Sequence, residues 1–528
     1  FFLKARITAF FTIISRITGL VRSMLLAHFL GTSHAGDAFV IAFMIPNLLR
    51  RLFAEGALTS AFIPVFTEIS GRTGESSREN QKKFFSQVFT VLILAVGIVS
   101  VLGVIAGPLL INVFYFFSGA DAAYINTASN LLRIMFPYLF FISLAALVQA
   151  VLNSHGNFSV PAFTPVLLNA SMIVSVFILK NIFALPAYAF SCGVLAGGIL
   201  QLAFQIPWLL RLGYRFAPRI NFQDPALRKM FYLMLPVVFS AGIYQINIML
   251  LDPIALSLGE GAASSLNFST RLQELPLGVF AVSISTVALP LFSRHTAEKK
   301  WEELGRDLLY ALRLIFILFI PAVIFTFLLN REIITAVYYS GNFRERSLEL
   351  TSACLLYHIA GALFVAMYRV IQPIYYSLQD TKTPVKIAGS LLFVNLAMAL
   401  LFSRIFNMNA PGIALASCLN AFFYFFLLFF FLRKKIPVFS PAPLLVSLLA
   451  VCSAMLLPGL AIWTVKNYFP ENLFIRVISG FGLSEIYIVK IRAIIKLLGG
   501  GLFLLPVYIG GIRQLNKKHI QSETGNVF

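Results

Sequence analysis

Long apolar segments follow one another along almost the whole chain, each bounded by charged residues or by clusters of proline and glycine. A helix needs about 20 consecutive apolar residues to cross the hydrocarbon core of a bilayer, and the segments reach this length repeatedly. The chain is 59% hydrophobic and only 12% charged. Soluble domains carry about 25% charged residues, so this composition excludes an ordinary soluble enzyme and a disordered chain.

The segments predict an all-α polytopic membrane protein with about fourteen transmembrane helices. Backbone polar groups find no water inside the bilayer, so each crossing segment must satisfy its hydrogen bonds within a helix. The helices are expected at residues 7–31, 37–66, 84–117, 125–152, 158–180, 186–211, 229–258, 262–292, 306–330, 349–378, 384–403, 411–432, 441–465 and 493–512. A surface-lying amphipathic segment is the alternative that we consider for residues 467–492.

The distribution of basic residues predicts the orientation of the chain. Of the 41 Lys and Arg residues, 23 lie on the side of the amino terminus, nine on the opposite side and nine within the predicted helices. Basic loops stay in the cytoplasm, so both termini are predicted to be cytoplasmic. The net charge of +20 is attributed to loops that face an anionic leaflet, and no nucleic-acid partner is expected. The first segment has no small-residue cleavage site, so we expect a retained helix rather than a signal peptide.

Three short patterns recur in the sequence at nearly one offset. Residues 61–66 recur at 287–292, 149–161 at 372–384, and 184–186 at 409–411, which gives offsets of 226, 223 and 225. Chance similarity between apolar segments is the alternative to a duplication. A unit of six helices begins and ends on the same side of the membrane, so the two copies are predicted to be parallel. The predicted parts are an N-lobe of helices 1–6 (1–213), a C-lobe of helices 7–12 (214–433), and helices 13–14 with a cytoplasmic tail (434–528).

Arginines inside the predicted helices are the most informative side chains. A charge at the bilayer centre costs at least ~2.5–3.5 kcal/mol on insertion scales, so such arginines usually face a watery cavity, a partner or a ligand. Snorkelling to the headgroups is the alternative, which we assign to Arg313 and Lys496 near helix ends. A guanidinium stays protonated and matches phosphate bidentately, which suits a pyrophosphate or another polyanionic headgroup. The candidates for lining one central cavity are Arg16, Arg22, Arg50, Arg51 and Arg271.

Few carboxylates accompany these arginines; they are Asp37, Glu55, Asp252 and Glu274. Glu274 follows Arg271 by three positions, and this spacing predicts an ion pair on one helix face. The remaining excess of positive charge favours a polyanionic substrate over an organic cation. Helix breaks are expected beside the arginines at residues 45–47 and 275–278, because proline and glycine free backbone groups and permit bending.

The sequence patterns of several enzyme classes are absent. There is no GxxxxGK[ST] phosphate loop, no HExxH and no GxSxG, so we expect neither an enzyme nor an intrinsic ATP drive. The four cysteines lie inside apolar stretches and form no CxxC pair. They are expected to be core residues rather than disulfides or metal ligands.

The segment at residues 15–22, followed by 37–39 and 45–57, resembles the MurJ/MviN family of bacterial lipid II flippases. These flippases belong to the multidrug/oligosaccharidyl-lipid/polysaccharide exporter superfamily. Residues 271–278 resemble the motif of the family's helix 8, and residues 379–384 resemble its turn before helix 11. The resemblance extends through nearly the whole chain.

This resemblance implies an inner-membrane protein that moves lipid II, an undecaprenyl-pyrophosphate-linked disaccharide-peptide, to the outer leaflet by alternating access for peptidoglycan synthesis. It implies that helices 13 and 14 form a groove for the lipid tail. Membrane lipids and cell-wall synthesis enzymes are further partners to consider. The substrate-binding cations implied are Arg16, Arg22, Arg50 and Arg271, and the candidate cavity or gating acids are Asp37, Glu55 and Glu274.

Some members of the family have been associated with a sodium site, whose nearest candidates here are Asp252, Asn395 and Ser417. Transport coupled to Na⁺ or to the membrane potential is therefore considered, and no other cofactor is expected. Many members carry an acid where this chain has Ser23 and Thr270, so its cavity is expected to be more positive. The alternatives are a flippase for another polyprenyl-pyrophosphate-linked oligosaccharide, a cation-coupled drug exporter and a non-transporting scaffold for wall-synthesis enzymes.

Overall fold

The structure is a computed structural model that describes residues 2–51, 58–70, 75–116, 119, 121–436, 442–468 and 485–502. These residues are almost entirely helical, and strand-like pairing within them is limited to one bridge between Ser340 and Phe343. Eleven of the described helices are long and apolar enough to cross a membrane. The all-α polytopic class is therefore confirmed.

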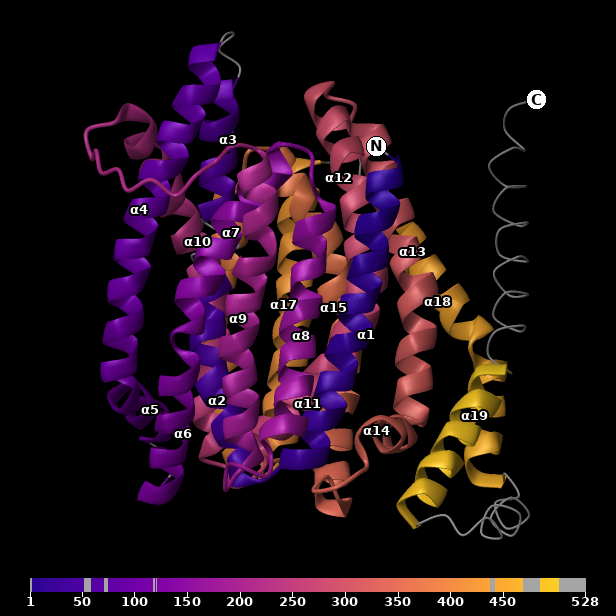
Figure 1. Ribbon diagram of the computed structural model, residues 1–528. Helices are drawn as coiled ribbons and strands as arrows, with labels where there is room; N and C mark the ends of the chain where they lie inside the picture. Colours follow the sequence, from indigo (N-terminus) through magenta and orange to yellow (C-terminus); the bar gives the residue numbers. More distant parts are fainter. Residues whose placement is uncertain are drawn as a thin grey trace, which may run out of the picture. The chain divides into compact units, whose positions relative to one another are not determined.

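Two compact units divide the chain, Phe1–Ser264 and Ser265–Phe528. The first contains α1 (Phe2–Leu30), α2 (His34–Leu49), α3 (Thr59–Ser70), α4 (Glu75–Ile105), α5 (Gly107–Tyr115), α6 (Ala122–Met135), α7 (Tyr138–Ser154), α8 (Ser159–Leu179), α9 (Pro186–Arg211) and α10 (Pro225–Leu256) (Figure 1). Helix α11 (Ala262–Pro276) begins in the last three residues of the first unit and continues in the second. The second contains η2 (Leu277–Ala281), α12 (Val282–Ala297), α13 (Trp301–Leu328), α14 (Asn330–Tyr338), α15 (Glu345–Ser377), α16 (Lys382–Leu400), η3 (Leu401–Ile405), α17 (Ala410–Lys435), α18 (Ala442–Ala454), α19 (Leu456–Tyr468) and a helix at 485–502.

The number of crossings remains a prediction, because three of the fourteen expected helices are not among the eleven. The second expected helix corresponds to the shorter helices α2 and α3, which lie on either side of the undescribed residues 52–57. The seventh corresponds to α10, and the last is described only as far as residue 502. Most of the segment expected to lie on the membrane surface, residues 469–484, is outside the described residues.

Helix packing repeats between the two units. In the first unit, contacts join α3 to α4 and α7, α4 to α7, and α9 to α7 and α8. In the second unit, contacts join α12 to α13 and α15, α13 to α15, and α17 to α15 and α16. The same five-helix arrangement is thus built twice in the same chain order, which supports the predicted repeat. The limits of the predicted lobes, residues 213 and 433, are derived from the sequence repeat rather than from the two compact units. They stay predictions.

The turns that precede α8 and α16 have the same backbone hydrogen bonds. The amide of Asn157 donates to the carbonyl of Leu152, and the turn before α16 repeats this bond 223 positions later, both at 2.9 Å. The residue before the donor has a positive φ in both turns, 73° at Gly156 and 57° at Gln379. This is the Schellman ending of a helix, which satisfies carbonyls that have no partner in the helix. The repeat therefore extends to individual turn bonds.

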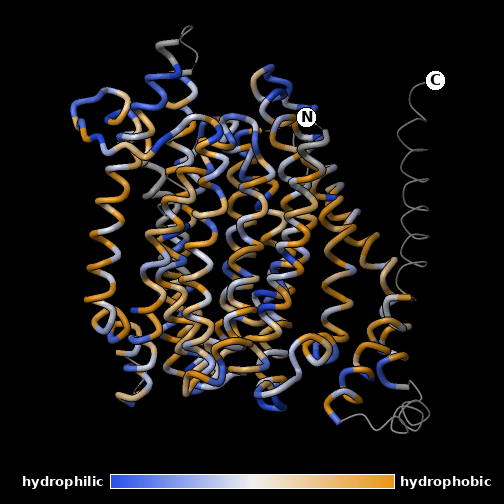
Figure 2. The backbone as a smooth tube through the Cα atoms, in the orientation of Figure 1, coloured by the Kyte–Doolittle hydropathy of each residue, from blue (hydrophilic) through white to orange (hydrophobic). Residues whose placement is uncertain are grey.

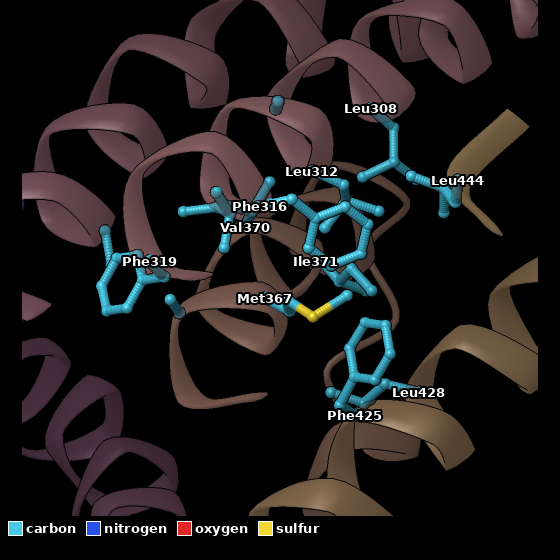
Figure 3. Close-up of a cluster of buried hydrophobic side chains, with 14 of the residues drawn as sticks. Leu308, Leu312, Phe316, Phe319, Met367, Val370, Ile371, Phe425, Leu428 and Leu444 are labelled. Carbon is cyan, nitrogen blue, oxygen red and sulfur yellow. The ribbon is translucent and has the colours of Figure 1, made fainter. Parts of the chain in front are cut away.

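Apolar side chains form the core of each unit and also cover much of its surface. In the second unit, Leu312 and Phe316 of α13, Met367 and Ile371 of α15, and Phe425 of α17 pack into one buried cluster (Figure 3). Large apolar side chains on the outside include several on α4, and Figure 2 shows hydrophobic residues along most of the helix lengths, with hydrophilic residues gathered near helix ends. This distribution suits helices surrounded by lipid.

Helices α8 and α9 approach closely because glycine occupies their contact. A Cβ added at Gly193 would lie 2.7 Å from the Cα of Met172, and one added at Gly197 would lie 3.1 Å from the Cα of Leu168. These two glycines are four positions apart, the spacing with which small residues let membrane helices approach. The contact therefore fixes the position of α8.

We expect Gly193→Ala to destabilise the protein by about 1–3 kcal/mol, because the new methyl group overlaps backbone that cannot rotate away. Gly389→Ala on α16 is the matched control, since a Cβ there meets no atom within 4 Å. The measurement is the thermal unfolding midpoint of the two variants in detergent. Equal midpoints would contradict the close packing of α8 on α9.

Candidate functional site

Arg22 of α1 is held by an amide from α8, which runs beside α1 (Figure 1). Its side chain is 9% exposed, and its Nη1 donates to Oδ1 of Asn169 at 2.9 Å. Nδ2 of Asn169 in turn donates to the carbonyl of Ser15 at 3.0 Å and to Oγ1 of Thr18 at 3.1 Å. The predicted binding residue Arg22 is therefore buried in a polar contact between two helices.

This contact lies near the middle of α8 and eight residues before the end of α1 (Phe2–Leu30). Asn169 is ten residues from either end of α8 (Ser159–Leu179), which corresponds to about 15 Å of helix on each side. A hydrocarbon core is about 30 Å thick, so Asn169 is at mid-membrane depth if α8 spans the bilayer. Sequence analysis did not single out Asn169. The available signal was an amide at the centre of an otherwise apolar segment, a place where polar groups are costly.

The other predicted cations of the first unit are Arg16 and Arg50. Arg16 is half-buried on α1, about 240° around the helix from Arg22 as the six-residue separation requires. Arg50 is also half-buried, and its Nε donates to Oδ1 of Asn47 at 3.1 Å. The predicted acid Glu55 lies outside the described residues.

In the second unit, Arg271 forms the ion pair that its spacing from Glu274 predicts. Nη1 of Arg271 lies 3.3 Å from Oε2 of Glu274, and the two side chains are 31% and 47% exposed. Pairs at such exposed positions contribute at most about 1 kcal/mol. A bound phosphate could therefore replace Glu274 as the partner of Arg271 at little cost.

The backbone beside these arginines widens into π-helical turns. The expected break at residues 45–47 is wrong, because α2 continues through Pro46 to Leu49 and becomes π-helical only at Arg50 and Arg51. Proline is accommodated here within the helix instead of ending it. After Pro276 the second copy likewise has a π-helical segment, Leu277–Ala281. Such π turns are frequent at functional sites in proteins.

Asp37 receives three hydrogen bonds at the beginning of α11. Its carboxylate is 3% exposed and accepts from the amides of Gly261 and Ser264, both at 2.7 Å, and from Oγ of Ser264 at 2.6 Å. Gly261 has a φ of 88°, and a Cβ there would lie 2.6 Å from the carbonyl oxygen of Thr32. A carboxylate at a helix amino terminus is favoured by the unpaired amides and the helix dipole. Asp37 therefore ties the start of α2 to the start of α11.

The residues that meet at the starts of α2 and α11 are separated in the sequence by nearly the offset of the repeat. Asp37 precedes Gly261 by 224 positions, and His34, whose amide donates to Oε1 of Glu260 at 3.1 Å, precedes Glu260 by 226. Helices α2 and α11 are counterparts in the repeat, so equivalent first turns meet each other. The gating role of Asp37 stays a prediction.

Asp380 forms hydrogen bonds that hold the turn at residues 379–384, the segment that resembles the family motif. Oδ1 of Asp380 accepts from the amide of Thr383 at 3.0 Å, at the start of α16, and Oδ2 pairs with Nζ of Lys435. Burial alone would raise the pKa of Asp380, but the hydrogen bonds from Lys435 and Thr383 outweigh it and lower the pKa to about 2. Asp380 thus fastens the end of α17 to the turn.

The candidate sodium ligands have oxygen donors, the type that hard cations prefer. Asp252 on α10 is half-buried in the first unit, whereas the second unit holds the buried Asn395 on α16 and the half-buried Ser417 on α17. Helices α16 and α17 pack together. Among the described residues, no group of three His, Cys, Asp or Glu side chains could hold a metal ion. The sodium site stays a prediction.

We expect Asp37→Ala to increase amide hydrogen exchange at Gly261 and Ser264 by roughly tenfold or more, because the loss removes charge-assisted bonds. Ser264→Ala should have a smaller effect, since it removes one bond of the three. Asp224→Ala is the matched control because Asp224 caps α10 through the amide of Ala226. Exchange at Gly261 and Ser264 that is unchanged in Asp37→Ala would contradict this assignment.

An all-helical, membrane-spanning fold in which one helix packing occurs twice, with a guanidinium buried between two helices, defines the class as a polytopic membrane protein with an internal repeat. The fold is shared with a solved structure described as the inward-facing conformation of a multidrug resistance MATE family transporter of the MOP superfamily. The TM-score is 0.63 at 16% identity, covering 82% of this chain and 98% of that chain.

The chain belongs to the lipid II flippase MurJ family, whose family model matches residues 26–479. It is 33% identical to a probable lipid II flippase MurJ of Vibrio cholerae, covering 92% of this chain and 94% of that protein. It is also 33% identical to the lipid II flippase MurJ of Burkholderia cenocepacia, covering 87% and 89%. A solved structure described as lipid II flippase MurJ in an inward closed conformation has a TM-score of 0.78 at 26% identity, covering 97% of this chain and 99% of that chain.

Proposed function

We propose that this protein flips lipid II from the inner to the outer leaflet of a bacterial cytoplasmic membrane by alternating access. Membership of the lipid II flippase MurJ family supports the substrate. The observation that carries the mechanism is the buried guanidinium of Arg22, held by Asn169 at the middle of the apolar helix α8. A site that retains a cation at this cost suits a substrate with a pyrophosphate.

The pyrophosphate headgroup needs cations at the depth where the charged lipid headgroups are absent. We assign this binding to an arginine-lined central cavity with Arg16, Arg22, Arg50 and Arg271, while the polyprenyl tail stays in lipid. A guanidinium offers five N–H donors in a fixed fork and cannot deprotonate, so it keeps its affinity for phosphate throughout the crossing. No catalytic step is part of this proposal.

The acids control access in this proposal. Asp37 holds the starts of α2 and α11 together, so opening at this end of the protein requires the loss of its three hydrogen bonds. Glu274 competes with the substrate for Arg271. Glu55 is retained as a third candidate acid. Coupling to Na⁺ through Asp252, Asn395 and Ser417, or to the membrane potential, is an option that transport measurements with and without each gradient distinguish.

Both termini are assigned to the cytoplasm, because 23 of the 41 basic residues lie on the side of the amino terminus. In this orientation the turn between α1 and α2, and with it Asp37, faces the outside. The C-terminal helices α18 and α19 and the helix at 485–502 are assigned to the lipid-tail groove. Membrane lipids are expected partners, and cell-wall synthesis enzymes are candidates for others.

We expect wild-type protein to restore growth to a bacterial strain depleted of its lipid II flippase, and Arg22→Ala, Arg50→Ala and Arg271→Ala to fail. Lysine at these positions should rescue partially, because it keeps the charge but loses the bidentate fork. Arg133→Ala is the matched control, since Arg133 is an exposed helical arginine whose Nε donates to the carbonyl of Val104 at 3.4 Å.

Membrane abundance of every variant is measured alongside growth. Failure of the wild type would count against lipid II as the substrate, and reconstituted vesicles carrying another polyprenyl-pyrophosphate-linked oligosaccharide would then test the alternative flippase. Rescue by all three alanine variants would show that the arginines do not carry the mechanism.

A further inference from the structure

Asn169 connects three groups of α1 through one side-chain amide. Its Oδ1 accepts from Arg22, while its Nδ2 donates to the carbonyl of Ser15 and to Oγ1 of Thr18. The Asn169 side chain is only 5% exposed, and its Nδ2 is 3.5 Å from where a Cβ would be added at Gly19. The amide therefore lies within ordinary van der Waals distance of α1 at Gly19.

The chemistry of these partners permits one orientation of the amide. A carbonyl oxygen such as that of Ser15 only accepts, and a guanidinium such as that of Arg22 only donates. The hydroxyl of Thr18 donates within its own helix, to the carbonyl of Ile14 at 2.9 Å, and so presents a lone pair to Asn169. Reversing the amide would oppose donors to donors at Arg22 and acceptors to acceptors at Ser15. The oxygen of Asn169 is thus fixed toward Arg22.

We propose that Asn169 is a positioning residue, which sets the place of the Arg22 guanidinium for the phosphates of the lipid headgroup. This inference rests on the proposed function. An amide serves this purpose better than a carboxylate, because it orients the cation without neutralising it. A guanidinium presents five N–H donors in a fixed fork, a geometry that matches phosphate oxygens bidentately.

The amide is also anchored on its other side. Met172, one turn after Asn169 on α8, lies against Gly193 of α9 and has its Sδ 3.9 Å from Nη1 of Arg22. Helix α8 is therefore held by α9 while it presents Asn169 to α1. A fixed support of this kind is what a positioning residue needs, since misplacement of a binding group by about 1 Å is enough to lose function.

The test is a double-mutant cycle between Arg22→Ala and Asn169→Leu, with the full-length protein in lipid nanodiscs and undecaprenyl pyrophosphate as the probe. We expect Asn169→Leu to weaken probe binding by roughly tenfold or more in the wild-type background. In the Arg22→Ala background the same change should have little effect, because Asn169 acts through Arg22. An equal loss in both backgrounds would overturn the inference, because a purely structural role does not depend on Arg22.

Thr18→Val gives a second variant that keeps side-chain shape but removes the hydroxyl that accepts from Asn169. It should weaken binding less than Asn169→Leu, and again only when Arg22 is present. If Asn169→Leu does not fold, as judged by its thermal unfolding midpoint, Thr18→Val replaces it in the double-mutant cycle with Arg22→Ala. If the wild type binds the probe no more strongly than Arg22→Ala does, the proposed function itself is contradicted. If binding depends on Arg22 but Asn169→Leu causes the same loss in both backgrounds, only the role of Asn169 is contradicted.

Discussion

The buried guanidinium of Arg22, which lies among apolar helices, is the strongest physical constraint on the packing of the first unit. Removing Arg22 from water is costly unless polar partners replace the lost hydration. Asn169 supplies one such partner, and it can do so only because its own amide is satisfied by Ser15 and Thr18. The pairing of α1 with α8 is therefore polar at its centre, although both helices are apolar along most of their length.

The position of α8 depends in turn on glycine. Gly193 and Gly197 leave room for the backbone of α8 to approach α9, and Met172 contacts both this glycine surface and Arg22. Helix α8 thus has two different faces, one that packs by shape and one that binds by hydrogen bonds. A small change in the first face is transmitted to the second, because a packed helix moves as a rigid body.

Sequence reasoning predicted the features that depend on local composition. The helical class, the repeat and the Arg271–Glu274 pair follow from hydropathy, offset and an i,i+3 spacing, and all are observed. The partners of Arg22 and Asp37 could not be predicted, since they lie 147 and 224 positions away in the sequence. Pro46 shows a different limit: its fixed φ is compatible with a helix, and tertiary packing rather than the residue decides whether the helix ends there.

The two buried polar contacts of the first unit differ in a way that fits alternating access. Asn169 joins α1 and α8, which belong to the same copy of the repeat, at the middle of α8, where a buried guanidinium that loses its partner is costly. Asp37 joins α2 and α11, which belong to different copies, at helix starts where water can satisfy freed amides. In the mechanism proposed above, the protein keeps the first kind of contact and breaks the second during transport. The cost of breaking each bond, set by the depth at which it lies, therefore separates the contacts that hold a lobe together from those that can open.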